Sequence, residues 1–168
     1  ALRTTYEQHN LQRKIVGFDT FEGFPSVDEK DGKYEVVKKG GYNVTKNYEN
    51  YLDRILGLLQ KERIIFPEIK NFELRKGDAV IETEKYLEEN PETIISLAYF
   101  DMDIYYPTKK CLQAILPYTT KGTVLAFDEL QIHEFPGETL AFNEVLGLNN
   151  HRIIRSKYSY GQTYIILE

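Results

Sequence analysis

The sequence contains little sulfur and no tryptophan. Among its 168 residues there is one cysteine, Cys111, and one methionine. A single cysteine excludes an internal disulfide and a zinc site built from cysteine ligands. The first residues show no signal-peptide pattern, so a reducing, cytoplasmic location is expected.

Positive charge and long hydrophobic runs are also scarce. Lysine and arginine total 21 against 26 aspartates and glutamates, which gives a net charge of −5. An acidic chain without a basic cluster lacks the usual means of binding nucleic-acid phosphates. No apolar run approaches the roughly 20 residues that span a bilayer. The sequence therefore predicts no nucleic-acid partner and no membrane segment, and it leaves a homo-oligomer open.

What the sequence does contain is typical of one α/β domain. Hydrophobic residues make up 42% and charged residues 28%, as in soluble globular proteins. Apolar runs typical of strands occupy residues 14–19, 71–75, 93–100, 122–127, 152–157 and 162–167. Hydrophobic positions three and four residues apart predict helices over residues 44–59, 82–89, 107–116 and 138–148. Strands that alternate with helices predict an open, mostly parallel sheet with helices on both faces.

Two segments carry more specific expectations. Residues 93–100 (TIISLAYF) are almost continuously apolar, which predicts a central strand buried on both faces. Residues 26–42 are charged and rich in glycine, and they show no periodicity. This second pattern predicts a mobile surface loop, which we interpret as a lid that orders over a bound substrate.

Acidic residues follow each of the first four predicted strands. They are Asp19, Asp78, Asp101 with Asp103, and Asp128 with Glu129. Turns favour aspartate for structural reasons, so any one of these acids could be a turn or helix cap. Ligands of open α/β sheets bind beyond the carboxyl ends of the strands, and four acidic strand ends favour a functional site there.

The position of Asp19 predicts a nucleoside-binding role. In a dinucleotide-type unit, an acid at the end of the second strand accepts the ribose hydroxyls, about 20 residues after a glycine-rich loop. Counting back from Asp19 places that loop before Ala1. A sheet without its central strand would leave two unpaired edges. We therefore expect residues 1–168 to be a single domain truncated at its N-terminus, without its first strand.

The acids after residues 93–100 and 122–127 are suited to a hard cation. Asp101, Asp128 and Glu129 offer oxygen ligands from two neighbouring strand ends, which suits Mg²⁺. Asp103 shares the first of these loops and could act as a base on a nearby hydroxyl. The alternative is that these acids are solvated turn residues.

Three blocks of the sequence resemble the macrocin O-methyltransferase family. They are residues 14–25 (KIVGFDTFEGFP), 99–108 (YFDMDIYYPT) and 124–129 (VLAFDE), in the order found in that family. Its members are class I, S-adenosylmethionine-dependent sugar O-methyltransferases of antibiotic and polysaccharide pathways. The resemblance covers the chain from about Lys14 to its end. It implies a seven-stranded Rossmann-like sheet whose last strand is antiparallel.

The resemblance also implies a set of site residues and a cofactor. For S-adenosylmethionine it implies Asp19, with Thr20 and Phe21, at the ribose and Gly77, Asp78 and Ala79 near the adenine. For Mg²⁺ it implies Asp101, Asp128 and Glu129 as ligands, with Asp103 as the general base. The acceptor would be a small sugar or a sugar nucleotide. Two features depart from the family: Glu129 replaces an aspartate, and the glycine-rich motif that holds the methionine end is absent.

Other functions are compatible with parts of this pattern. A buried strand followed by Asp101 and Asp103 also fits a metal-dependent glycosyltransferase that uses a nucleotide sugar. An Asp-x-Asp phosphatase is a weaker match, because that motif normally opens its domain. The absent glycine-rich loop would suit a non-catalytic, Rossmann-like binding domain. The glycosyltransferase reading explains neither Asp78 nor the pair at Asp128 and Glu129.

Overall fold

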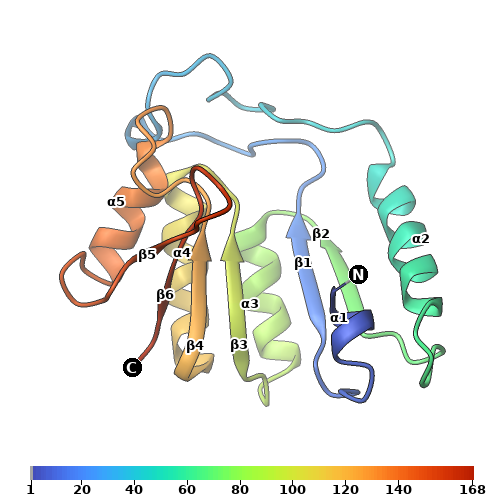
Figure 1. Cartoon of the computed structure of the whole chain (residues 1–168). Coiled ribbons are helices and arrows are strands. Elements are labelled where there is room, and N and C mark those ends of the chain that lie inside the picture. Colours follow the sequence, from blue (N-terminus) through green and yellow to red (C-terminus); the bar gives the residue numbers. More distant parts are fainter. Residues whose placement is uncertain (1) are drawn as a thin grey trace.

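Two sheets and their helices make up residues 2–168, the part of the chain that the computed structural model describes (Figure 1). The strands are β1 (Ile15–Asp19), β2 (Phe72–Lys76), β3 (Ile95–Phe100), β4 (Thr119–Phe127), β5 (Ile154–Arg155) and β6 (Thr163–Ile166). The α-helices are α1 (Leu2–Tyr6), α2 (Tyr48–Lys61), α3 (Ala79–Glu89), α4 (Tyr105–Ile115) and α5 (Pro136–Val145). Two short 3-10 helices are η1 (Glu29–Asp31) and η2 (Leu116–Tyr118).

The strands form one parallel pair and one mixed sheet. Strands β1 and β2 pair in parallel as a two-stranded sheet. The second sheet has the order β3-β4-β6-β5, in which β3 and β4 are parallel and β6 runs antiparallel to both β4 and β5. The predicted α/β class and the antiparallel last strand are confirmed.

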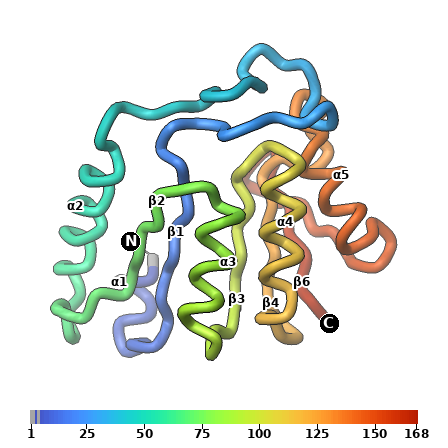
Figure 2. The backbone as a smooth tube through the Cα atoms, turned by 180° about the vertical axis from the view of Figure 1, so that it is seen from behind, coloured from blue at the N-terminus to red at the C-terminus, as the bar shows by residue number. Residues whose placement is uncertain are grey.

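The hydrophobic core lies within the four-stranded half of the molecule. Its fully buried members include Leu112 of α4, Leu125 and Phe127 of β4, Phe142 of α5 and Ile165 of β6. Helices α3, α4 and α5 stand together on one face of this sheet (Figure 2). The ring of Phe127 stacks on Phe100 at 4.9 Å between centroids and meets Phe142 edge-on at 5.2 Å. This packing fixes the ends of β3 and β4, where the acidic residues follow.

Strand β3 is less buried than its sequence predicts. Ala98 and Phe100 face the helices, but Leu97 and Tyr99 on the opposite face are 61% and 48% exposed. Within residues 2–168 no helix covers that opposite face, so the prediction of burial on both faces is wrong for this chain. The free edge of β3 also lies beside β1 without a hydrogen-bonded ladder between them (Figures 1 and 2).

Residues 26–42, predicted to be a mobile loop, are anchored to the rest of the chain near Asp31 and Gly41, while most of their side chains are exposed. Asp31 is 1% exposed, and its carboxylate accepts the backbone N–H groups of Asp28 at 2.6 Å and Tyr105 at 2.5 Å. Farther along, Gly41 O accepts the Phe24 N–H, and a Cβ on Gly23 would lie 2.2 Å from that same oxygen. Composition alone could not reveal these long-range contacts.

None of the helices in the described part of the chain is long and apolar enough to cross a membrane.

Candidate active site

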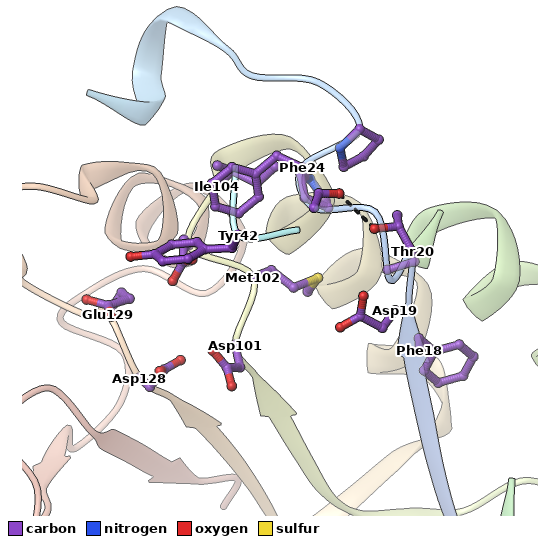
Figure 3. A pocket seen from close by; sticks show the side chains of 15 residues that line it. Phe18, Asp19, Thr20, Phe24, Tyr42, Asp101, Met102, Ile104, Asp128 and Glu129 are labelled. Carbon is purple, nitrogen blue, oxygen red and sulfur yellow. Dashed lines mark hydrogen bonds between the residues drawn. The ribbon is translucent and has the colours of Figure 1, made fainter. Parts of the chain in front are cut away.

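A cavity of about 380 Å³ opens where β1, β3 and β4 end (Figure 3). Each strand delivers a carboxylate to its wall: Asp19 from β1, Asp101 after β3, and Asp128 after β4. Asp103 and Glu129, next along the latter two loops, line it as well. The parallel direction of β1, β3 and β4 brings these distant sequence positions to one rim. The five acids that the sequence singled out here therefore meet at one cavity.

A strained turn presents Asp103. Its backbone φ of 58° lies in the left-handed region, which is uncommon for residues other than glycine. The Ile104 N–H donates to the Met102 carbonyl at 2.6 Å and closes a three-residue turn around Asp103. Ile104 itself is 2% exposed and anchors the turn to the interior. Strain of this kind persists where the surrounding structure holds it, often at functional sites.

The cavity is strongly acidic. Burial, with the nearby carboxylates of Glu129 and Asp101, raises the pKa of Asp103 to about 7. Burial and the carboxylates of Asp101, Glu129 and Asp103 raise the pKa of Asp128 to about 7. Burial also raises the pKa of Glu129, and Asp101 adds to the effect. No lysine, arginine or histidine is among the residues described as lining this cavity. The site therefore favours ligands that bring positive charge.

The acids of this cavity have the ligand chemistry of a divalent-cation site, but they do not stand in a complete coordination geometry. Within residues 2–168, no three histidine, cysteine, aspartate or glutamate side chains stand close enough together to hold a metal ion. Asp101, Asp128 and Glu129 nonetheless border one cavity, and Asp128 Oδ1 is buried without a hydrogen-bond partner among the described atoms. Carboxylate oxygens are the ligands that Mg²⁺ prefers. A buried, unpaired carboxylate oxygen beside two other acids fits a bound cation.

The loop after β1 orients Asp19. Asp19 Oδ1 accepts the Phe21 N–H at 2.6 Å, and the Thr20 hydroxyl donates to the Gly23 carbonyl at 2.7 Å. Asp19 and Thr20 line the cavity, whereas Phe21, although adjacent, does not. Phe21 has a φ of 56°, so it serves the turn that presents its neighbours.

The turn after β2 contributes only in part. Of Gly77, Asp78 and Ala79, only Ala79 lines the cavity. Asp78 is the N-cap of α3, and its side chain accepts the Val80 N–H at 2.9 Å. The Gly77 N–H donates to the Asp19 carbonyl at 2.9 Å and extends the pairing of β1 with β2. Gly77 and Asp78 thus have structural roles in this chain, as turn and cap chemistry would suggest.

A second cavity of about 410 Å³ adjoins the first. The two share Tyr42, Asp128 and Glu129. The Tyr42 ring makes an edge contact with Phe24 at 5.6 Å, and it lies 6.3 Å from the ring of Phe135. These rings form a continuous aromatic edge that runs from one cavity into the other. Such a surface suits the apolar faces of a bulky organic ligand.

Sequence reasoning missed three contributors. Phe24 and Tyr42 reach the cavity only because the chain returns at the Gly23–Gly41 contact, which no local pattern announces. Glu138 in the first turn of α5 is fully buried, and burial raises its pKa well above the ordinary range. A glutamate near a helix start is common, so Glu138 carried no signal in the sequence.

The chain is similar to solved methyltransferase structures. With the crystal structure of the calicheamicin methyltransferase CalS11 it shares 40% identity at a TM-score of 0.94, over 98% of this chain and 64% of that one. With the apo structure of CalS11, described as a TDP-rhamnose 3'-O-methyltransferase of calicheamicin biosynthesis, it shares 37% identity at a TM-score of 0.82, over 98% of this chain and 63% of that one. The chain therefore spans a little under two thirds of CalS11.

Similarity to another methyltransferase concerns the fold alone. The O-methyltransferase NovP matches at 14% identity and a TM-score of 0.60, over 93% of this chain and 60% of that one.

Searches of family models and of curated proteins find no match. The resemblance to sugar O-methyltransferases that the sequence indicates is confirmed by the comparison with CalS11.

Proposed function

We propose that this chain is the main part of an S-adenosylmethionine-dependent O-methyltransferase that acts on a sugar hydroxyl with the help of a divalent cation. One observation carries the proposal: five carboxylates from three strand ends line a cavity that has no basic residue among its described lining. Both S-adenosylmethionine, through its sulfonium, and a divalent cation bring positive charge to such a site. The similarity to CalS11 supports the same reaction class.

The cofactor would lie along the β1 side of the cavity. Asp19 stands at the end of its strand with Thr20 beside it, where a carboxylate can accept ribose hydroxyls. Ala79 and Phe18 supply apolar wall on this side, where an adenine ring could pack. S-adenosylmethionine would supply the methyl group. Its methionine end would be held by a glycine-rich loop that residues 1–168 do not contain.

The carboxylates on the other side would organise the acceptor. Asp101, Asp128 and Glu129 would hold Mg²⁺, which lowers the pKa of a hydroxyl that binds it. Asp103 would accept the hydroxyl proton as the oxygen forms its bond to the methyl carbon and the carbon–sulfur bond breaks. Burial raises the pKa of Asp103, and the carboxylates of Glu129 and Asp101 add to the effect; a cation held by these acids would offset their contribution and favour the ionised base. Positioning supplies much of the remaining rate enhancement in a displacement of this kind.

The acceptor would enter through the second cavity. Tyr42 lies in both cavities, and the rings of Tyr34 and Phe135 extend the aromatic edge away from the acids. A sugar could place one hydroxyl near Asp103 while its ring rests against this edge. No lysine or arginine is among the described residues that line the second cavity, and Glu134 adds negative charge there, so a diphosphate would lack a basic partner. A sugar attached to a larger scaffold therefore deserves testing beside a sugar nucleotide.

We also propose that a further strand of the same protein fits between β1 and β3. The facing edges of these strands are unpaired within residues 2–168. Unpaired strand edges are unfavourable in a finished sheet. A parallel strand at this place would complete the sheet and end beside Asp19 and Asp101, at the rim of the cavity.

A thermal-shift assay on the complete protein tests the reaction class. S-adenosylhomocysteine at a hundred times its dissociation constant should stabilise the fold by about 2.7 kcal/mol, which raises the melting temperature by several degrees. A glycosyltransferase would respond instead to UDP with Mn²⁺. Stabilisation by UDP with Mn²⁺ and none by S-adenosylhomocysteine would reject the proposal.

A further inference from the structure

The first turn of α5 holds the loop that carries Asp128 and Glu129. Glu138 is 0% exposed, and its Oε1 accepts the Glu129 backbone N–H at 2.9 Å. The next residue, Thr139, accepts the Gln131 N–H on its hydroxyl at 2.8 Å. Two consecutive side chains of one helix thus bind alternate amides of a single loop.

This arrangement is unusual for a helix start. First-turn carboxylates commonly bind the N–H groups of their own helix or remain in solvent. Glu138 instead reaches away from α5 to a different segment, and it does so from a fully buried position. Its second oxygen, Oε2, is buried without a hydrogen-bond partner among the described atoms. Burying a carboxyl group with an unpaired oxygen costs free energy, which indicates that its bond to the Glu129 N–H stabilises the fold or the site.

Other contacts also hold the loop: Leu130 is 4% exposed within the core, and Arg155 Nη2 donates to Gln131 Oε1 at 3.0 Å. Gln131 has a φ of 68°, which shows that the loop turns sharply just after Glu129. Asp128 N–H donates to the Phe100 carbonyl at 3.2 Å, which extends the pairing of β4 with β3. Beyond Asp128 the strand ladder ends, so the two bonds from α5 continue the restraint through Glu129 and Gln131.

We infer that Glu138 is a positioning residue, which fixes the backbone of Glu129, with help from Thr139, and so sets where the carboxylates of Asp128 and Glu129 stand. The inference rests on the proposed function, because it assigns those carboxylates to a cation. Groups that orient metal ligands through a hydrogen bond typically contribute 10- to 100-fold to metal affinity. Glu138 does not line either cavity, so its effect is exerted through Glu129.

Two substitutions at Glu138 separate the hydrogen bond from the ionisable group. Glu138→Gln removes the ionisable carboxyl group and keeps an oxygen that can accept the Glu129 N–H. Glu138→Met keeps the length of the side chain and removes the acceptor. If Glu138 acts by position, Glu138→Met weakens Mg²⁺ binding at least about tenfold, whereas Glu138→Gln stays within about threefold of the original protein.

The experiment is a calorimetric titration of Mg²⁺ into the complete protein and each variant, combined with hydrogen exchange at the Glu129 amide. The amide should exchange faster in Glu138→Met and at its original rate in Glu138→Gln. Thr123→Val is the matched control, because Thr123 is also buried and accepts a backbone N–H, from Thr120 at 3.0 Å, at the opposite end of β4. It should lower the melting temperature and leave Mg²⁺ affinity unchanged.

Each outcome decides the inference. Equal losses of Mg²⁺ affinity in both Glu138 variants would show that the ionisable group acts instead of position. Unchanged affinity in Glu138→Met would show a purely structural role, and either result overturns the inference. If Glu138→Met does not fold, Thr139→Val decides: we expect about a tenfold loss of Mg²⁺ affinity with faster exchange at the Gln131 amide, and no change in either would overturn the inference. Mg²⁺ binding without methyl transfer in the original protein would reject the proposed function alone, whereas no Mg²⁺ binding would reject this inference.

Discussion

The four-stranded sheet is packed more completely than the two-stranded sheet. In the first, β4 and β6 contribute fully buried side chains such as Leu125 and Ile165, and three helices pack over them. In the second, no residue of β1 or β2 is fully buried, and most of their side chains are partly exposed. The carboxylates after β4 therefore follow a strand paired on both sides, whereas Asp101 and Asp19 follow strands that each have an unpaired edge.

This difference separates two parts of the proposed reaction. Asp101, Asp103, Asp128 and Glu129 would manage the acceptor, and they belong to the packed half. Asp19, which would bind the cofactor, belongs to the less packed half. Chemistry on the acceptor side can thus be tested by substitution with little risk to the fold. Cofactor binding should then depend on the further strand that we propose beside β1.

The first prediction concerns local stability. In residues 1–168 alone, backbone amides of β4 should exchange with solvent at least about a hundredfold more slowly than those of β1, because core strands open only with the whole fold. Hydrogen exchange followed by mass spectrometry measures both. With the proposed further strand paired to it, β1 should gain protection. Equal protection of β1 and β4 in the shorter chain would contradict the contrast between the two halves.

A second prediction tests the base in the packed half. Asp103→Asn should lower kcat by about 10²- to 10⁴-fold, because the amide cannot accept the hydroxyl proton. Affinity for S-adenosylhomocysteine, measured by calorimetry, should not change. Asp53→Asn on α2 is the control, since Asp53 is half-exposed and lies outside both cavities. Near-normal turnover in Asp103→Asn would remove Asp103 from the reaction.

A third prediction tests the cofactor side in the complete protein. Asp19→Ala should weaken S-adenosylhomocysteine binding about ten- to a hundredfold, because hydrogen bonds to a charged group contribute about 1.5–3 kcal/mol. The matched control is Glu22→Gln, an acid of the same loop whose side chain is 78% exposed. Calorimetry that gives the same affinity for Asp19→Ala and the original protein would exclude a ribose contact.

The smallest predicted effect is a pH dependence at the surface of the packed half. Hydrogen bonds from Lys109, Lys30 and Tyr105 lower the pKa of Glu144 from 4.5 to about 2. A lowered carboxyl pKa means that this group stabilises the fold above pH 4.5 and loses that contribution as the pH falls through about 2.

Melting temperatures at pH 7 and at pH 2 measure this contribution. Glu144→Gln should melt slightly below the original protein at pH 7, and the difference should shrink at pH 2. Glu88→Gln, at an exposed position on α3, should show no such change. A difference that grows toward low pH would contradict the assignment.

Much of the site could be predicted because the end of an apolar run in the sequence indicates where a buried strand ends. Asp19, Asp101 and Asp128 each follow an apolar run, and parallel strands bring such positions together. Asp78 follows the same rule and yet caps α3, since a turn acid can bind the nearest free N–H as readily as a ligand.

What the sequence could not predict depends on contacts between distant segments. Tyr42 reaches the cavity through the packing of Gly23 against Gly41, and Glu138 acts through a bond to a different loop. The apolar run of residues 93–100 predicts a strand correctly, but periodicity cannot tell whether the segment that covers its second face belongs to the same 168 residues.

The most direct measurement of the central claim is methyl transfer by the complete protein from labelled S-adenosylmethionine to a panel of sugar acceptors, with and without EDTA. The account predicts transfer that EDTA abolishes and added Mg²⁺ restores, and Asp101→Asn should imitate the loss. Full transfer in EDTA would contradict the role given to Asp101, Asp128 and Glu129. No transfer to any sugar, with S-adenosylhomocysteine binding absent as well, would contradict the assignment as a methyltransferase.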